Sequence, residues 1–146
     1  MSAVYSYRYP RPAVTVDAIV MAAGNQLLLI RRKKDPYAGM WALPGGFMDM
    51  NETLEEACSR ELYEETGLKL PQMKQFRVFD APDRDPRQRT LSVVHFANVD
   101  YPMKANGGDD ASEARWFPVD QLPDLAFDHS EIISCFLSVL RNNIPE

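Results

Sequence analysis

The chain has 146 residues, of which 45% are hydrophobic and 25% are charged, and its formal net charge is −5. This length fits one domain with a hydrophobic core, and the composition excludes a disordered or low-complexity chain. The acidic balance argues against general binding to nucleic acids, although a metal ion or a local basic cluster can still attract phosphates. No apolar run approaches the roughly 18 residues of a membrane span, and residues 1–12 lack the apolar segment of a signal peptide. We therefore expect a cytoplasmic protein without membrane or nucleic-acid partners.

The N-terminal part of the chain predicts a β-hairpin and a glycine-rich connection. Residues 13–22 and 26–32 are rich in β-branched and apolar side chains, and a Gly-Asn turn separates them. A short strand is expected at 41–43, before a Pro-Gly-Gly sequence whose backbone can turn tightly.

The clearest helix covers residues 53–66. Thr53 and Glu56 have the spacing of a capping box, in which each side chain accepts a hydrogen bond from the backbone of the other. Gly67 follows at the position where a left-handed residue ends many helices.

The rest of the chain predicts more strands and a C-terminal helix. In chain order, we expect strands at 74–80, 89–101 and 115–117, a helical turn at 118–122, and a helix from a capping Asp128 to about residue 141. A charged loop, 81–88, separates the first two of these strands. His95 alternates with apolar residues and is expected to be packed, and His129 is expected to be a capping-region residue. The element order predicts one mixed α/β domain.

Five glutamates divide between two faces of the helix at 53–66. At about 100° per residue, Glu61, Glu64 and Glu65 fall on the apolar face, whereas Glu55 and Glu56 fall on the opposite, solvent-facing side. Like charges three and four residues apart repel each other, and partial burial adds a desolvation cost. A bound cation makes such an arrangement tolerable. Carboxylates without accompanying His or Cys favour Mg²⁺ or Mn²⁺ over zinc.

The same helix carries a family motif. The chain runs Gly46, five residues, Glu52, seven residues, and then Arg-Glu-Leu-Tyr-Glu-Glu-Thr-Gly-Leu from residue 60. This resembles the complete Nudix box, with every defining position filled. The flanking strands and the C-terminal helix resemble the family's αβα sandwich, in which a mixed β-sheet lies between helices. The resemblance implies a single Nudix hydrolase domain over residues 1–146.

The resemblance also implies roles for the residues of the box. The implied ligands of Mg²⁺, for which Mn²⁺ can substitute, are Glu61, Glu64, Glu65 and the backbone carbonyl of Gly46. Arg60 resembles the family arginine that orients a neighbouring glutamate, and Glu52 resembles its electrostatic partner. Arg60 and Glu64 are therefore candidate catalytic residues as well.

The implied reaction is the hydrolysis of a diphosphate bond. Metal ions neutralise the phosphate oxygens and activate a bound water, while a carboxylate accepts the water's proton. Two candidates for this base stay open: Glu65 within the box, and Glu113 in the acidic loop before the strand at 115–117. The alternative for Glu113 is an ordinary solvated loop residue.

Three segments outside the box bear on the substrate. Residues 9–12, 41–47 and 83–87 resemble ADP-ribose pyrophosphatases and the Nudix domain of repressors that sense NAD metabolites. Such a site needs cations for the diphosphate and an aromatic platform for the base. The candidates are the cations Arg31, Arg32, Arg84 and Arg87 and the aromatic residues Tyr9 and Phe47. In the alternative reading, the loop arginines pair with neighbouring aspartates and the aromatic residues belong to the core.

The leading hypothesis is hydrolysis of ADP-ribose to AMP and ribose 5-phosphate. The alternatives are a nucleoside triphosphate or dinucleotide polyphosphate pyrophosphohydrolase and, from another class, a non-catalytic sensor domain that binds ADP-ribose. The intact box favours an enzyme, as does the absence of a winged helix before the chain ends at Glu146. The resemblance further implies a homodimer, in which residues 4–12 help to build the partner's site.

Overall fold

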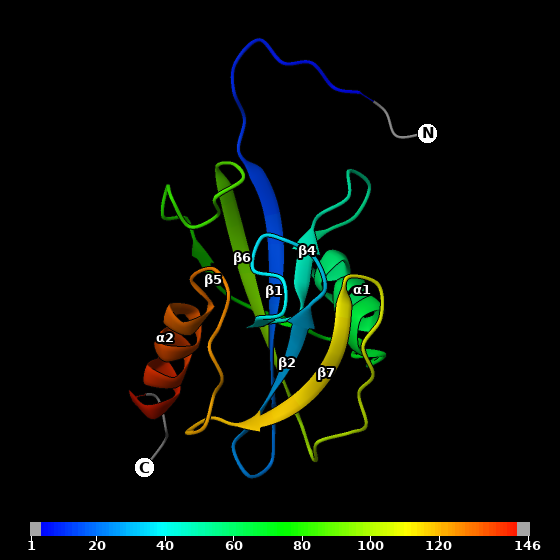
Figure 1. Cartoon of the computed structure of the whole chain (residues 1–146), viewed down its shortest axis with the longest axis vertical. Helices are drawn as coiled ribbons and strands as arrows, with labels where there is room; N and C mark the ends of the chain where they lie inside the picture. Colours follow the sequence, from blue (N-terminus) through cyan, green and yellow to red (C-terminus); the bar gives the residue numbers. More distant parts are fainter. Residues whose placement is uncertain (1–3, 143–146) are drawn as a thin grey trace.

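A mixed β-sheet lies between two helices in the computed structural model, which describes residues 4–142 (Figure 1). Within this range the elements are β1 (Ala13–Ala22), β2 (Gln26–Arg32), β3 (Trp41–Ala42), β4 (Gly45–Phe47), α1 (Leu54–Thr66), β5 (Lys74–Phe79), β6 (Thr90–Val99), β7 (Ala111–Pro118) and α2 (His129–Asn142). No helix in this part of the chain is long and apolar enough to span a bilayer.

Strand β1 organises the sheet. It is parallel to β6 over its whole length, from Ala13 opposite Thr90 to Ala22 opposite Val99. It is antiparallel to β4 near its start and to β2 at its end. The order of the main path is β3-β2-β1-β6-β5, with β4 paired to β1 and β7 paired to β2. This arrangement brings β4, which precedes α1 in the chain, to the centre of the sheet.

The two faces of β1 belong to two different parts of the core. Val16, Ala18 and Val20 pack with the apolar residues of α1, including Leu62. Ile19 packs on the other face with residues of α2. Successive side chains of a strand point to opposite faces, so an apolar strand such as β1 can support a helix on each side.

Most of the expected elements are found, and α1 has the expected ends. Thr53 and Glu56 form the capping box with hydrogen bonds of 3.0 and 3.1 Å. Gly67 ends the helix in the left-handed conformation, with φ of 77°. His95 is buried, as expected for a packed histidine.

Four local expectations were wrong. The Gly-Gly connection forms β4, because β1 supplies a partner. Strand β7 begins at Ala111 instead of residue 115, because it pairs with the whole of β2. Residues 118–122 form a turn without a helix, with a hydrogen bond from Gln121 N–H to the Pro118 carbonyl. The carboxylate of Asp128 pairs with a side chain of the 81–88 loop and does not cap α2.

Candidate active site

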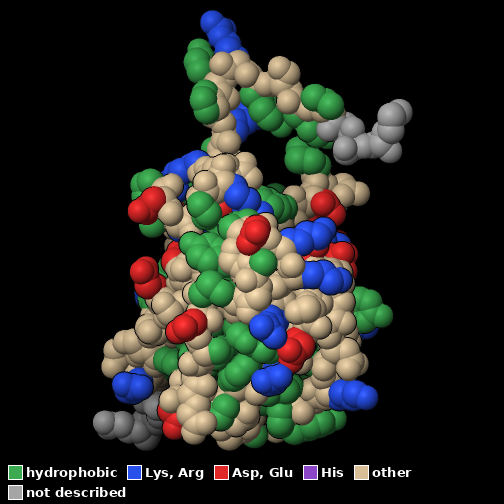
Figure 2. All heavy atoms as spheres, viewed as in Figure 1, with side chains coloured by type: hydrophobic (Ala, Val, Ile, Leu, Met, Phe, Trp, Pro, Cys, Tyr) green, Lys and Arg blue, Asp and Glu red, His purple; other side chains and the backbone are tan. Residues whose placement is uncertain are grey.

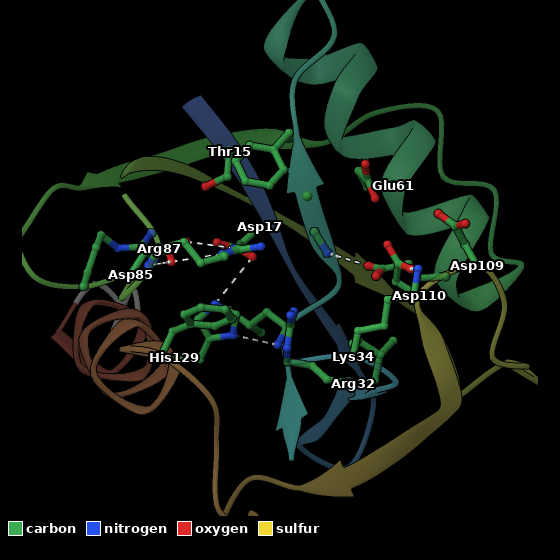
Figure 3. A pocket seen from close by; sticks show the side chains of 18 of the residues that line it. Thr15, Asp17, Arg32, Lys34, Glu61, Asp85, Arg87, Asp109, Asp110 and His129 are labelled. Carbon is green, nitrogen blue, oxygen red and sulfur yellow. Dashed lines mark hydrogen bonds and ion pairs between the residues drawn. The ribbon is translucent and has the colours of Figure 1, made fainter. Parts of the chain in front are cut away.

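A cavity of about 330 Å³ lies between α1, β4 and the N-terminal end of α2 (Figure 3). Its lining is unevenly charged. Glu61, Asp109 and Asp110 lie on one side, where Lys34 pairs with Asp110, whereas Arg87 lies on the other side with Asp85. The lining carboxylates include Glu61, Glu65, Asp109 and Asp110, and the lining cations are Arg32, Lys34, Arg84 and Arg87. Such a cavity can hold a ligand that carries both a metal ion and phosphate groups.

Two glutamates of α1 face the cavity beside the glycines of β4. Glu65 is only 4% exposed, and its Oε1 accepts a hydrogen bond of 2.7 Å from the Gly45 N–H. The carboxylate of Glu61 lies so close to Gly46 that a Cβ atom there would be 2.6 Å from it. The lack of a side chain at Gly46 therefore allows the Glu61 carboxylate of α1 to approach β4 closely.

Arg60 donates hydrogen bonds to three acidic side chains, one before α1 and two within it. Its Nε and Nη2 donate to both oxygens of Glu52, at 2.9 and 2.6 Å. Its Nη1 donates to Glu61 at 2.9 Å and to Glu64 at 3.2 Å. The expected pairing of Arg60 with Glu52 is thus present, and Arg60 also contacts two of the three glutamates expected to bind metal.

Glu64 departs from the burial expected on the helical projection. Its side chain is 38% exposed, whereas that of Glu61 is 13% exposed and Glu65 is buried. The projection places residues on an ideal cylinder, but α1 contacts the sheet over a narrower arc, with Glu64 at its edge. Glu55 and Glu56 are exposed, as expected.

The environment perturbs the acidity of these groups. Burial raises the pKa of Glu65 well above its usual value, and Glu61 and Asp17 add to the effect through like charge. Burial also raises the pKa of Glu61, although Arg60 opposes this. The hydrogen bonds from Arg60 lower the pKa of Glu52. A carboxylate that is costly to ionise, such as Glu65, gains from a nearby cation.

The carboxylate oxygens of the α1 glutamates suit a hard divalent cation. Carboxylate oxygens are the ligands that Mg²⁺ and Mn²⁺ prefer. Among residues 4–142, however, no three His, Cys, Asp or Glu side chains converge closely enough to hold one ion. Arg60 occupies Glu61 and Glu64, and the Gly45 N–H occupies Glu65. Metal binding at these glutamates therefore requires an exchange of these hydrogen bonds.

Arg84 is the most deeply held cation of the cavity. Its side chain is 4% exposed, and its Nε and Nη2 donate to Asp128 at 2.9 and 2.7 Å. Nη1 has no hydrogen-bond partner among the described residues, and no buried side-chain nitrogen or oxygen of that range lacks a partner. Arg84 lines the cavity, so Nη1 is a candidate donor for a ligand.

Arg87 and Arg32 complete the cationic side. Arg87 forms two hydrogen bonds to the buried Asp85, at 2.9 and 3.1 Å, and its guanidinium carbon is 5.3 Å from the ring centroid of Phe47. Arg32 donates to a loop carbonyl, and its guanidinium carbon is 4.9 Å from the ring of Phe127. These cation–π contacts hold the guanidinium groups against flat apolar surfaces.

Five residues proposed from the sequence do not line the cavity: Arg60, Glu64, Arg31, Glu113 and Tyr9. Arg31 is exposed and pairs with Glu113 at 3.7 Å, and Glu113 also accepts from Arg115 at 2.6 Å. Neither Arg31 nor Glu113 lines the cavity, because they face each other across β2 and β7, on the side of β2 opposite to Arg32. The expected loop position of Glu113 was wrong, since it lies within β7. Tyr9 is 69% exposed in a segment that extends away from the sheet (Figure 1).

Comparison with known proteins decides the family. A model described as the NUDIX domain matches residues 11–136. The chain belongs to the Nudix family. Its sequence is 47% identical over 130 residues to an ADP-ribose pyrophosphatase of Methanocaldococcus jannaschii, covering 88% of this chain and 75% of that relative. The family and its αβα fold, both predicted from the sequence, are confirmed.

Two solved structures are similar to this Nudix domain. A bifunctional NMN adenylyltransferase/ADP ribose pyrophosphatase from Francisella tularensis, complexed with AMP and a manganese ion, is 34% identical with a TM-score of 0.83. The match covers 91% of this chain but only 43% of that protein. The NUDIX domain of Shewanella oneidensis NrtR, complexed with ADP ribose, is 29% identical with a TM-score of 0.84, and the match covers 90% of each chain.

Several cavity residues outside the Nudix box were not identified from the sequence. Asp17 is buried in β1 between the Ser92 hydroxyl, which donates to it, and His129, whose Nε2 is 3.6 Å from its Oδ1. Burial raises the pKa of Asp17 and lowers that of His129. An aspartate in the middle of an apolar strand was the available signal for Asp17. Phe127 carried no signal in the sequence.

Proposed function

We propose that this Nudix domain is an enzyme that hydrolyses ADP-ribose to AMP and ribose 5-phosphate, and that residues 1–146 act as one domain. One observation carries the proposal. A single cavity joins the box carboxylates Glu61 and Glu65 to three arginines from outside the box. The 47% identity to an ADP-ribose pyrophosphatase supports this substrate over others.

A divalent cation, Mg²⁺ or in its place Mn²⁺, belongs to this proposal. The residues that would hold it are Glu61, Glu64, Glu65 and the backbone carbonyl of Gly46. When bound, it neutralises the diphosphate oxygens and lowers the pKa of a coordinated water. The donor chemistry supports this assignment, as does the manganese ion in the similar Francisella tularensis structure.

Within the chain, we assign the proton-accepting role to Glu65. Its buried carboxylate lines the cavity and is oriented by the Gly45 N–H, which supports its role as the acceptor of a proton from a water in the cavity. The other candidate, Glu113, is held outside the cavity by two arginines. Arg60 keeps Glu61 and Glu64 oriented through hydrogen bonds from one nitrogen.

The cationic side would bind the rest of the substrate. Arg84 and Arg87 each keep one terminal nitrogen free of the aspartate that fixes the guanidinium group. Such preoriented donors bind phosphate oxygens well. Arg32 and the exposed ring of Phe47 stand beside them and offer a further cation and a surface for a base.

A substrate panel with Mg²⁺ tests the proposal. ADP-ribose should be hydrolysed with a higher kcat/KM than nucleoside triphosphates or dinucleotide polyphosphates. Lack of ADP-ribose turnover, with turnover of either other class, would replace the proposed substrate. A sensor domain, the alternative suggested by the NrtR similarity, would bind ADP-ribose without hydrolysing any of these compounds.

One matched pair of variants separates an enzyme from a sensor. Glu65→Gln removes a carboxylate of the cavity, whereas Glu55→Gln removes one from the exposed face of the same helix. Glu65→Gln should lose metal-dependent turnover while remaining folded, and Glu55→Gln should retain it. Equal turnover in the two variants would refute the role of Glu65.

We also propose a homodimer built with the N-terminal segment. Val4, Tyr5, Tyr7 and Tyr9 are exposed on an arm that leaves the body of the domain before β1 (Figure 2). Burial of these side chains against a second copy would remove apolar surface from water. Sedimentation should give a dimer for the full chain and a monomer after removal of residues 1–10. The cytoplasmic location and the lack of nucleic-acid and membrane partners stay predictions.

A further inference from the structure

Three successive residues at the start of α2 reach three different parts of the cavity. The ring of Phe127 contacts Arg32, the carboxylate of Asp128 binds Arg84, and the imidazole of His129 reaches the connection between β3 and β4. Phe127 has a φ of 54°, a left-handed value that is uncommon for a bulky residue. Strained backbone of this kind is often retained where function depends on it.

Asp128 fixes the direction of Arg84. The two parallel hydrogen bonds, 2.9 and 2.7 Å long, hold the guanidinium plane in one orientation inside the protein. The nitrogen left over, Nη1, forms no hydrogen bond to the described residues and is the candidate donor for a ligand in the cavity. Without Asp128, Arg84 would have no acceptor for two of its three nitrogens and would lose this orientation.

His129 fixes the backbone beside Glu65. The Leu43 N–H donates to His129 Nδ1 at 3.0 Å, so Nδ1 carries no proton and Nε2–H points toward Asp17. Burial lowers the pKa of His129, which keeps the ring in this neutral form.

The backbone from Leu43 to Gly45 connects the His129 hydrogen bond to the one that holds Glu65. His129 accepts from Leu43 N–H, the Pro44 carbonyl accepts from β1 at 2.8 Å, and Gly45 N–H donates to Glu65 at 2.7 Å. Each of three consecutive residues is therefore held by a different element. A shift at Leu43 displaces the donor that holds the Glu65 carboxylate.

We propose that residues 127–129 form a positioning element of the active site. In this element Asp128 orients Arg84 for substrate, and His129 orients the backbone that holds Glu65. The inference rests on the proposed diphosphate hydrolysis and adds to it the residues that set the geometry of the two sides of the cavity.

The Asp128→Asn variant tests the cationic side. It keeps the shape of the side chain but removes the charge that orients Arg84. We expect KM for ADP-ribose to rise about 10-fold, the typical worth of a hydrogen bond to a charged group, with little change in kcat. An unchanged KM would overturn the role of Asp128.

Two substitutions of His129 test the other side. His129→Leu removes the acceptor for Leu43 N–H, and displacement of Glu65 should lower kcat about 100-fold with a smaller effect on KM. In His129→Asn the amide oxygen can replace Nδ1 as the acceptor, so most of kcat should return. Equal loss in both variants, or no loss in His129→Leu, would overturn the role of His129. His129→Ala replaces His129→Leu if the latter does not fold.

Ile133→Ala is the matched control on α2. Ile133 is buried in the core and lines no part of the cavity. This variant should lower the melting temperature without moving KM or kcat of the folded protein. If Ile133→Ala reproduces the changes seen at Asp128 and His129, those changes reflect loss of stability, and the positioning element is refuted.

Amide hydrogen exchange tests the same element without turnover. Exchange at Leu43 and Gly45 should accelerate in His129→Leu but stay near the wild-type rate in His129→Asn and Ile133→Ala. Unchanged exchange in His129→Leu would overturn the inference. Wild-type protein that does not hydrolyse ADP-ribose would instead refute the proposed function, and the exchange measurement would still decide whether His129 holds the Leu43–Gly45 segment.

Discussion

At the scale of single residues, the two glycines of β4 approach different neighbours. A Cβ atom on Gly45 would overlap the backbone carbonyl of Val16 in the adjacent strand. The nearest atoms that a Cβ atom on Gly46 would meet belong to the Glu61 carboxylate, at 2.6 Å. Backbone within a sheet cannot move away cheaply, whereas a side chain can rotate. One glycine therefore serves the fold and the other serves the site.

Substitution of these glycines should separate stability from activity. Gly45→Ala should lower the free energy of unfolding by about 1–3 kcal/mol, as overpacking does elsewhere. Gly46→Ala should change it by less than about 1 kcal/mol but should reduce turnover strongly, because Glu61 must leave its position. Urea unfolding and Mg²⁺-dependent kinetics check both. A Gly46→Ala protein with full activity would contradict the placement of Glu61.

His95 should make the stability depend on pH. Burial lowers its pKa in the folded chain, whereas in the unfolded chain it binds a proton near pH 6.5, which is about its ordinary pKa. Below that pH the unfolded state binds more protons, so stability is complete above about pH 6.5 and decreases as the pH falls. His129 acts in the same direction, whereas Glu65, whose pKa is raised in the folded chain, acts in the opposite direction.

The two histidines should therefore lower the melting temperature as the pH falls from about 7.5 to about 5.5, on either side of the ordinary histidine pKa. In His95→Gln the decrease should be smaller, because one of the two buried histidines no longer titrates. The contrary outcome, an equal decrease in both proteins, would exclude His95 as a source.

At the scale of elements, α1 combines strong local signals with a functional face. Its capping box and its glycine C-cap depend on residues within a few positions of each end. Interactions of such short range can be read from the sequence. The exposure of Glu64 could not be read in this way, because it depends on which part of the helix surface packs against the rest of the fold.

Loss of the α1 capping box should lower the stability of the protein without lowering the rate of hydrolysis. Thr53→Ala removes one side of the capping box and should lower the free energy of unfolding by about 1 kcal/mol. Turnover should stay unchanged, since Glu65 lies at the far end of the helix and is held by Gly45. A large loss of kcat in folded Thr53→Ala would show that the helix end and the site are coupled.

At the scale of the whole molecule, the cavity is assembled from distant parts of the chain. Asp17 comes from β1, Glu65 from α1, Arg84 from the loop before β6, and His129 from α2. Burial raises the pKa of Glu65, and the like charges of Glu61 and Asp17 raise it further. The fold therefore contains electrostatic repulsion that a bound divalent cation would relieve.

Added Mg²⁺ should stabilise the whole domain. For a ligand that binds only the folded state, the gain is about 2.7 kcal/mol at 100 times its dissociation constant. The melting temperature of the wild type should rise with Mg²⁺ concentration and return to its starting value after chelation. Glu65→Gln should show a smaller rise. An equal rise in both proteins would argue against Glu65 as a ligand.

The sequence by itself determined the family, most strands, and both helices with the caps of α1. These follow from local periodicity, from capping residues and from a motif within one segment. Glu61, Glu65, Arg84 and Arg87, which the sequence singles out by spacing and charge, line one charged cavity, and their roles there stay predictions. Local interactions act over a few residues, so they leave a readable pattern in the chain.

Only the tertiary structure decided which of the other candidates reach the cavity. The pairing of β2 with β7 turns Arg31 and Glu113 away from it, and the start of α2 brings Phe127 and His129 into it. These positions depend on the strand partner and on the packing of α2, which residues far away in the chain supply. Contacts between distant segments leave no fixed spacing in a single sequence, and for that reason they emerge only in the folded molecule.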